Sequence, residues 1–222
     1  MKKYTIIILL LLLFSFAAIY RTSIFSWLNV SLYGINHTDD FSKLQDGDII
    51  FQVSQSAQSR AIQLATKSKY SHCGIIYKKG AEYYVFEAIQ PVTLTPLQKW
   101  INRGKDKHYI VKRLKNAKEV LTQNVLKTMK QEGEKLKGKN YDLTFEWSDA
   151  KIYCSELVWK LYKRAANIDL STLEQLGDFD LSHPTVQAKI KERYGNKIPL
   201  KEKVVSPKAL FESPLLITIQ ER

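Results

Sequence analysis

The chain has 222 residues, of which 45% are hydrophobic, 11% aromatic and 25% charged, with 9 Gly, 6 Pro and 2 Cys. These values exclude a disordered chain, a collagen and a small disulfide scaffold, and they leave a globular domain that can bury a full core. Lys and Arg number 34 against 22 Asp and Glu, so the net charge of +12 favours anionic neighbours such as nucleic acid, acidic lipids or cell-wall polymers.

The N-terminus carries the pattern of an export signal. Two lysines near the start precede an uncharged apolar run from Tyr4 to Tyr20. The length of this run lies between a signal-peptide core and a membrane-spanning helix, so residues 1–20 are predicted to be a signal peptide or an N-terminal membrane anchor. Cleavage after Ala17 would remove both lysines and leave 12 − 2 = +10. We therefore expect a protein of the periplasm or cell envelope, and nucleic acid becomes an unexpected partner.

One domain is predicted over residues 40–222, because no repeat, low-complexity tract or Pro/Gly-rich linker divides them. In chain order we expect a strand at 49–53, a helix at 57–67, a hairpin of strands 72–77 and 83–88, a strand at 108–114, a helix at 117–135, a helix beginning near Cys154, and a strand at 215–219. Strands and helices mixed in this order indicate an α+β domain with a small antiparallel sheet.

The hairpin carries the first chemical clue. If its turn is centred on Lys79-Gly80, the numbers of paired residues sum to 159, as those of His72 and Glu87 do. The two side chains would then stand opposite each other on one face, where the carboxylate could hold the imidazole. A cross-strand ion pair on a solvated face is the structural alternative, and a one-residue slip would separate the two. The same alternation sends Cys73 to the other face, which is predicted to be core.

The second clue is Cys154, which heads a run whose apolar residues recur at helical spacing as far as Ala165. A thiol in the first turn of a helix meets the positive end of the helix dipole, which lowers its pKa and favours the thiolate. A helix capped earlier, at Ser148 or Asp149, would weaken this effect. Two structural alternatives need no chemistry: a buried core cysteine, or a disulfide with Cys73 outside the cytoplasm.

Together, a thiol, an imidazole and a carboxylate are the groups that nucleophilic acyl transfer requires. Six stretches resemble the YiiX-like permuted papain-type proteins: Asp46–Phe51, Tyr70–Gly74, Tyr84–Ala88, Tyr153–Trp159, Phe179–Ser182 and Val204–Pro207. That family is related to the NlpC-type cell-wall peptidases, but its chain is circularly permuted so that the nucleophile helix comes last.

The resemblance implies a papain-like, circularly permuted NlpC-type fold with the nucleophile helix in the C-terminal half. It also implies that Cys154 is the nucleophile, His72 the general base and acid, and Glu87 the residue that orients His72. At Cys73, next to His72, this sequence departs from the family, which usually has a residue other than cysteine at that position. The opposite-face position of Cys73 predicts that it packs in the core outside the site, and that no Cys73–Cys154 disulfide forms.

The implied mechanism is thiolate attack on an amide or ester carbonyl, followed by an acyl-enzyme that water or another nucleophile releases. The oxyanion would be held by the backbone N–H of Cys154 and a second donor, for which Gln52 and Tyr70 are candidates. We infer no cofactor and no metal, because no residue cluster has zinc-ligand spacing and no glycine-rich loop could cradle phosphates.

Three functions stay open at this point. The leading prediction is an exported cysteine amidase or peptidase that cleaves an amide bond of a cell-wall peptide or related substrate. The alternatives are a lipid-directed acyl hydrolase or acyltransferase, and a non-catalytic ligand-binding protein of the same fold. An apolar tunnel beside Cys154 would favour a lipid, whereas a polar open groove would favour a peptide.

Overall fold

Six strands form the main sheet, in the order β4-β3-β2-β1-β5-β8. The computed structural model describes residues 40–222, so the predicted signal or anchor at residues 1–20 lies outside the described part. The strands are β1 (Ile49–Ser54), β2 (His72–Lys79), β3 (Glu82–Glu87), β4 (Thr93–Pro96), β5 (Gly104–Leu114) and β8 (Leu216–Glu221). All neighbours pair antiparallel, which confirms the predicted α+β class with a small antiparallel sheet.

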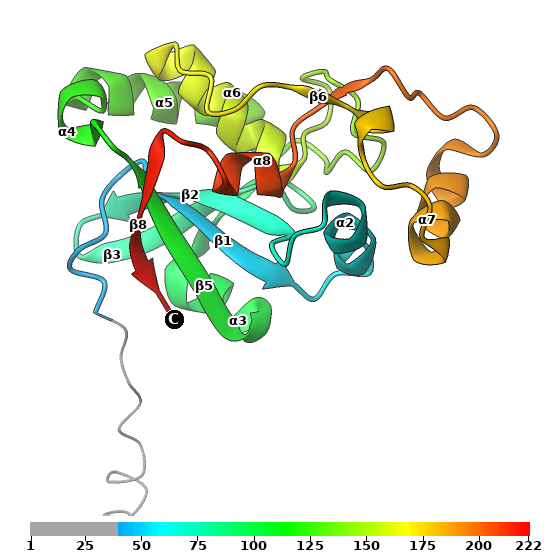
Figure 1. The fold of residues 1–222 in the computed structure, drawn as a ribbon. Helices are drawn as coiled ribbons and strands as arrows, with labels where there is room; N and C mark the ends of the chain where they lie inside the picture. The colour runs from blue at the N-terminus through cyan, green and yellow to red at the C-terminus, as the bar shows by residue number, and fades with distance from the viewer. Residues whose placement is uncertain (1–39) are drawn as a thin grey trace, which may run out of the picture. The chain divides into compact units, whose positions relative to one another are not determined.

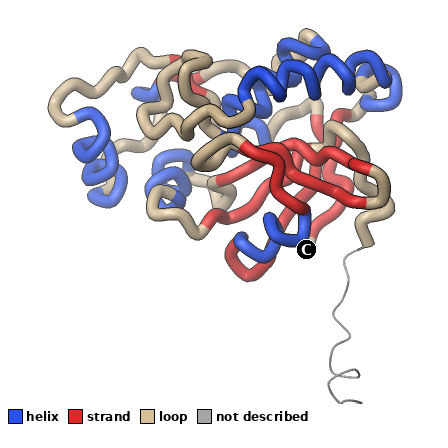
Figure 2. The backbone as a smooth tube through the Cα atoms, turned by 180° about the vertical axis from the view of Figure 1, so that it is seen from behind, coloured by secondary structure: helices blue, strands red, loops and turns tan. Residues whose placement is uncertain are grey.

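Helices cover both faces of this sheet. They are α2 (Ser59–Thr66), α3 (Leu97–Arg103), α4 (Ala117–Val120), α5 (Gln123–Leu136), α6 (Cys154–Ala166), α7 (Pro184–Tyr194) and α8 (Pro207–Phe211), with the 3-10 helix η1 (Leu176–Asp178). Figure 1 shows α5 and α6 over one face and α3 against the other, and Figure 2 shows the same layers from behind. A second, two-stranded sheet joins β6 (Glu174–Gln175) to β7 (Lys203–Val204).

The core lies between the sheet and the α5–α6 pair. Ile75 and Phe86 of the hairpin pack there with Met129 of α5 and Leu157 of α6, and none of the four is more than 2% exposed. Among residues 40–222, no helix combines the length and apolar character that a membrane span requires.

The expected helix at 117–135 is two helices, and the single-helix prediction is wrong. The chain leaves helical geometry at Leu121, and Thr122 then caps α5, its hydroxyl accepting a hydrogen bond from the N–H of Val125. The predicted strands at 49–53, 108–114 and 215–219 are confirmed as β1, β5 and β8, each with slightly different ends.

The hairpin register also differs from the prediction. Ile75 pairs with Phe86 and Lys79 with Glu82, so the paired numbers sum to 161 and the turn is centred on Gly80-Ala81. Gly80 takes a φ of +60°, a conformation that glycine adopts without strain, and this favours the turn one step further along. Because the sum changed by two, each residue keeps its face of the sheet.

Candidate active site

His72 and Glu87 meet diagonally across β2 and β3. In the observed register the position opposite Glu87 belongs to Gly74, where a Cβ would lie 3.3 Å from that of Glu87. Gly74 has no side chain to occupy this space, and diagonal neighbours on one face remain within reach of long side chains. His72 Nε2 donates to Glu87 Oε2 at 2.6 Å, so the predicted contact between imidazole and carboxylate is present.

Glu87 is a fully buried carboxylate with several donors around it. Besides His72, it accepts hydrogen bonds from Thr95 Oγ1 at 2.6 Å, Trp100 Nε1 at 2.9 Å and Arg103 Nη2 at 2.5 and 2.7 Å. Burial alone would raise the pKa of Glu87, but His72 and Arg103 outweigh it and lower the pKa to about 2. Glu87 is therefore charged, and it fixes the ring of His72, which also stacks on Trp100 with centroids 6.0 Å apart.

Cys154 is the first residue of α6, as the helix-dipole argument requires. Tyr153 is the N-cap, and its N–H donates to Glu156 Oε2 at 3.3 Å, so the alternative cap at Ser148 or Asp149 is wrong. Apolar residues of α6 face the core at helical spacing and set the orientation of this first turn: Leu157, Val158 and Leu161. The Cys154 thiol consequently lies at the positive end of a helix of 13 residues.

The Cys154 thiol forms a hydrogen bond with His72. Nε2 of His72 is committed to Glu87, so Nδ1 is the ring nitrogen left for the sulfur. Burial would lower the pKa of His72, yet Cys154 and Glu87 raise it to about 9. A hydrogen bond from Cys73 and the nearby imidazole outweigh burial and hold the pKa of Cys154 well below its usual range. The two groups therefore form a thiolate–imidazolium pair.

The expectation that Cys73 stays outside the site is wrong. Cys73 does face the core, as alternation predicts, but its thiol and its backbone N–H both donate hydrogen bonds to the Cys154 sulfur. Helix α6 packs on this same face of the sheet, and its first residue, Cys154, lies beside Cys73 near the start of β2. Burial and the Cys154 charge raise the pKa of Cys73 well above the usual value, so it keeps its proton, and both cysteines are free thiols.

Tyr141 is the site residue that the sequence did not reveal. It lies in the loop before α6 and lines the same cavity as Cys154. Burial and the Cys154 charge raise the pKa of Tyr141 well above its usual value, so the phenol remains a donor. No local pattern marks this tyrosine, because only the folding of its loop brings it to the thiol.

Neither sequence candidate for the second oxyanion donor lines the cavity at Cys154. Gln52 pairs with His72 across β1 and β2, and its amide oxygen is directed at Gly104. The ring of Tyr70 packs on Phe211, with centroids 4.3 Å apart. Tyr141, by contrast, lines the cavity together with Cys154.

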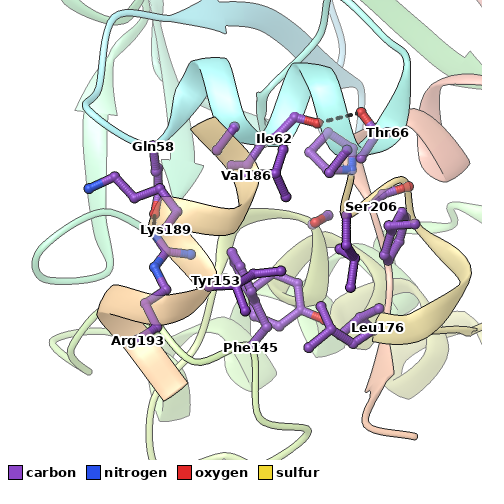
Figure 3. Close-up of a pocket in the computed structure, with 18 of the residues that line it drawn as sticks. Gln58, Ile62, Thr66, Phe145, Tyr153, Leu176, Val186, Lys189, Arg193 and Ser206 are labelled. Carbon is purple, nitrogen blue, oxygen red and sulfur yellow. Dashed lines mark hydrogen bonds between the residues drawn. The ribbon is translucent and has the colours of Figure 1, made fainter. Parts of the chain in front are cut away.

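An apolar cavity that is open to solvent lies beside Cys154. Helices α2 and α7, η1 and the start of α6 enclose it, and its walls are almost wholly apolar. Figure 3 shows Ile62 of α2, Val186 of α7, and Phe145 and Leu176 around it, with Gln58, Lys189 and Arg193 together along one side. Such walls suit an aliphatic group better than a charged peptide.

Two of the stretches that resemble the permuted papain-type proteins, Tyr153–Trp159 and Val204–Pro207, meet at this cavity. Ser155 Oγ donates to the carbonyl of Val205 at 2.7 Å, and the N–H of Val205 donates to the Tyr153 hydroxyl at 3.1 Å. The segment of residues 204–207 is thereby held against the first turn of α6, where it forms one wall of the cavity.

Comparison with known proteins agrees with this geometry. Residues 43–220 match the family model of the permuted papain-like amidase enzymes YaeF/YiiX, the C92 family of peptidases. The chain is 49% identical over 175 residues to the uncharacterized protein YiiX of Escherichia coli (strain K12), covering 79% of this chain and 85% of that protein.

A crystal structure of the metalloprotein YiiX from Escherichia coli O157:H7 is similar in fold, with a TM-score of 0.77 and 47% sequence identity. The match covers 81% of this chain and 98% of that one. In residues 40–222 of the present chain, no group of three or more His, Cys, Asp or Glu residues is arranged to hold a metal ion.

Proposed function

The chain belongs to the permuted papain-like amidase family, and on this premise we propose that it is an exported cysteine amidase acting through Cys154, His72 and Glu87. The observation that supports the proposal most directly is the hydrogen-bonded series from the Cys154 thiol through His72 to the buried carboxylate of Glu87. Thiolate, imidazolium and orienting carboxylate are the three parts of a cysteine acyl-transfer site.

The proposed reaction begins when the Cys154 thiolate attacks the amide carbonyl. A carbon–sulfur bond forms, and the carbonyl electron pair moves to oxygen, where the Cys154 N–H and the Tyr141 hydroxyl donate to the oxyanion. His72 gives its proton to the leaving nitrogen as the carbon–nitrogen bond breaks. Water then attacks the thioester, losing a proton to His72, and the carboxylic acid leaves as the Cys154 thiolate is restored.

A series of chromogenic amides tests this proposal. Purified protein should release 4-nitroaniline from acyl-4-nitroanilides, and Cys154→Ser should release none above background. Mass spectrometry of the quenched reaction should find the acyl group on Cys154. Absence of both turnover and acylation would favour a non-catalytic binding protein.

A lipid-directed acyl hydrolase or acyltransferase is the second candidate, and the apolar cavity beside Cys154 favours it over a cell-wall peptide hydrolase. If the cavity holds the acyl chain, each added methylene should raise kcat/KM about fourfold until the cavity is full, because a buried CH₂ contributes about 0.8 kcal/mol. Ala61→Phe, which fills the cavity from α2, should abolish this dependence. A flat series, with faster cleavage of a wall-type peptide amide, would instead identify the peptide hydrolase.

Export and membrane association belong to the same proposal. They rest on the N-terminal pattern and on the excess of basic residues, which would attract acidic lipids or wall polymers. A reporter fused after Arg222 should be active outside the cytoplasm, and activity only in the cytoplasm would rule export out.

A further inference from the structure

The side chains of Arg193, Gln58 and Tyr141 form a hydrogen-bonded chain that leads to the neighbourhood of Cys154. Arg193 Nη2 donates to Gln58 Oε1 at 2.6 Å, and Gln58 Nε2 donates to the Tyr141 hydroxyl at 2.8 Å. Tyr141 and Cys154 line the same cavity, close enough for the Cys154 charge to raise the pKa of Tyr141. The three residues come from α7, from the N-cap of α2 and from the loop before α6, and all of them line the apolar cavity.

The direction of each hydrogen bond in this chain is fixed by the one before it. A guanidinium can only donate, so the oxygen of the Gln58 amide must face Arg193 and its NH₂ must face Tyr141. The Tyr141 oxygen then accepts from Gln58, and its single hydrogen is left for the sulfur or for an oxyanion that forms beside it. Arg193 is held for this role by its contact over the ring of Phe145, at 5.1 Å from the centroid.

We propose that Arg193 and Gln58 are positioning residues that turn the hydroxyl hydrogen of Tyr141 toward Cys154 and the reacting carbonyl. They act through Tyr141 and do not touch the reacting atoms. This inference rests on the proposed function, because it takes Cys154 as the nucleophile. It assigns a catalytic purpose to α7, which the proposed function uses only as a wall of the cavity.

Gln58→Glu is the sharpest test, because it preserves shape and reverses one hydrogen bond. A carboxylate still accepts from Arg193, and more strongly, but it cannot donate to Tyr141. The Tyr141 hydroxyl would then donate to residue 58 and turn away from Cys154. A merely structural role for Gln58 predicts a harmless or stabilising change, whereas a positioning role predicts a large loss of rate.

The readout is the burst of 4-nitrophenolate as 4-nitrophenyl butyrate acylates Cys154. Gln58→Glu and Tyr141→Phe should each slow the burst about 100-fold with little change in KM, which is the loss expected for one oxyanion donor. In the Tyr141→Phe background, Gln58→Glu should change the rate by less than about threefold, because both changes remove the same interaction. Gln187→Glu, the same substitution at an exposed site of α7, should leave the rate unchanged. Full additivity of the two changes would overturn the inference.

Alkylation of Cys154 by iodoacetamide keeps this test independent of turnover. Four titratable groups face the Cys154 thiol: His72 and Cys73 of β2, Tyr153 at the N-cap of α6, and Tyr141. Gln58→Glu should move the midpoint of the alkylation profile up by about one pH unit, since a hydrogen bond to the thiolate is lost. The shift should vanish in the Tyr141→Phe background. A shift that persists there would show that the charge introduced at position 58 acts directly on the thiolate, and it would refute the positioning role of the hydrogen-bonded chain.

The two readouts also separate the two hypotheses. If the wild-type protein gives no burst, but Gln58→Glu still causes the Tyr141-dependent alkylation shift, the proposed function is refuted and the positioning role of the hydrogen-bonded chain stands. Gln58→Met, which removes the amide without adding a charge, covers the case in which Gln58→Glu fails to fold, and it should slow the burst by about tenfold. An unchanged burst in Gln58→Met would likewise overturn the inference.

Discussion

Replacing Glu87 by glutamine probes how much the buried carboxylate contributes to stability. The change keeps the shape of the side chain and turns one of its two oxygens into an NH₂ group. Oε2 accepts from His72, Trp100 and Arg103, whereas Oε1 accepts from Thr95 and Arg103 only. An NH₂ in the position of Oε2 would face three donors.

The amide should therefore place its NH₂ in the position of Oε1. There the Thr95 hydroxyl can rotate to accept, and the side chain of Arg103, which is 38% exposed, can turn to water. The remaining oxygen still accepts from His72 and Trp100. What is lost is the charge that stabilises the imidazolium and the guanidinium.

The pKa of Glu87 gives the size of this loss. It falls from 4.5 to about 2 in the folded protein, a difference of roughly 2.5 pH units, which corresponds to about 3 kcal/mol of folding stability. Because the folded pKa is the lower one, this stability is present above pH 4.5 and is lost as the pH falls toward 2. We expect it to shrink to about half at pH 3.

Urea unfolding followed by far-UV circular dichroism measures the effect. Glu87→Gln should lower the free energy of unfolding by about 3 kcal/mol at pH 7, and less at pH 3. Glu82→Gln, the same substitution at an exposed position of β3, should change it by less than about 0.5 kcal/mol. If both variants lower the free energy of unfolding equally, or if the loss in Glu87→Gln does not depend on pH, the charge of the Glu87 carboxylate does not stabilise the fold.

Three further predictions concern the thiol. Cys154→Ala and His72→Ala should each abolish acyl-enzyme formation with little change in far-UV circular dichroism, whereas Glu87→Gln should keep residual turnover, because its oxygen still orients the imidazole. Iodoacetamide should alkylate Cys154 rapidly near pH 6, since the thiolate–imidazolium pair persists up to the pKa of His72 at about 9; an unchanged profile in His72→Ala would contradict the pair. Cys73→Ala should raise the alkylation midpoint of Cys154, and intact mass without reductant should show two free thiols rather than a bridged peptide.

The sequence alone determined which side chains share a face. Strand alternation has a period of two, so His72 and Glu87 stay on one side of the hairpin in any register whose paired numbers sum to an odd value. The predicted sum of 159 was wrong and the observed 161 kept the contact. In the same way, helical spacing located α6 and placed Cys154 near its start, and the structure then decided for the first turn over an earlier cap at Ser148 or Asp149. These are local properties of the chain, and local propensities are enough to set them.

Only the tertiary structure decided what surrounds these residues. Strand alternation correctly assigned Cys73 to the core face. No local pattern predicts that α6 packs on that face with its first residue, Cys154, beside Cys73. Arg193 and Gln58 stand 135 positions apart in the chain and meet because α7 packs against α2. Neither residue shows in the sequence which partner it will have, since the choice depends on packing that the whole domain makes at once. The sequence of α6 therefore indicated the thiol that we propose as the nucleophile, whereas the hydrogen bonds among Arg193, Gln58 and Tyr141 arise only in the folded chain.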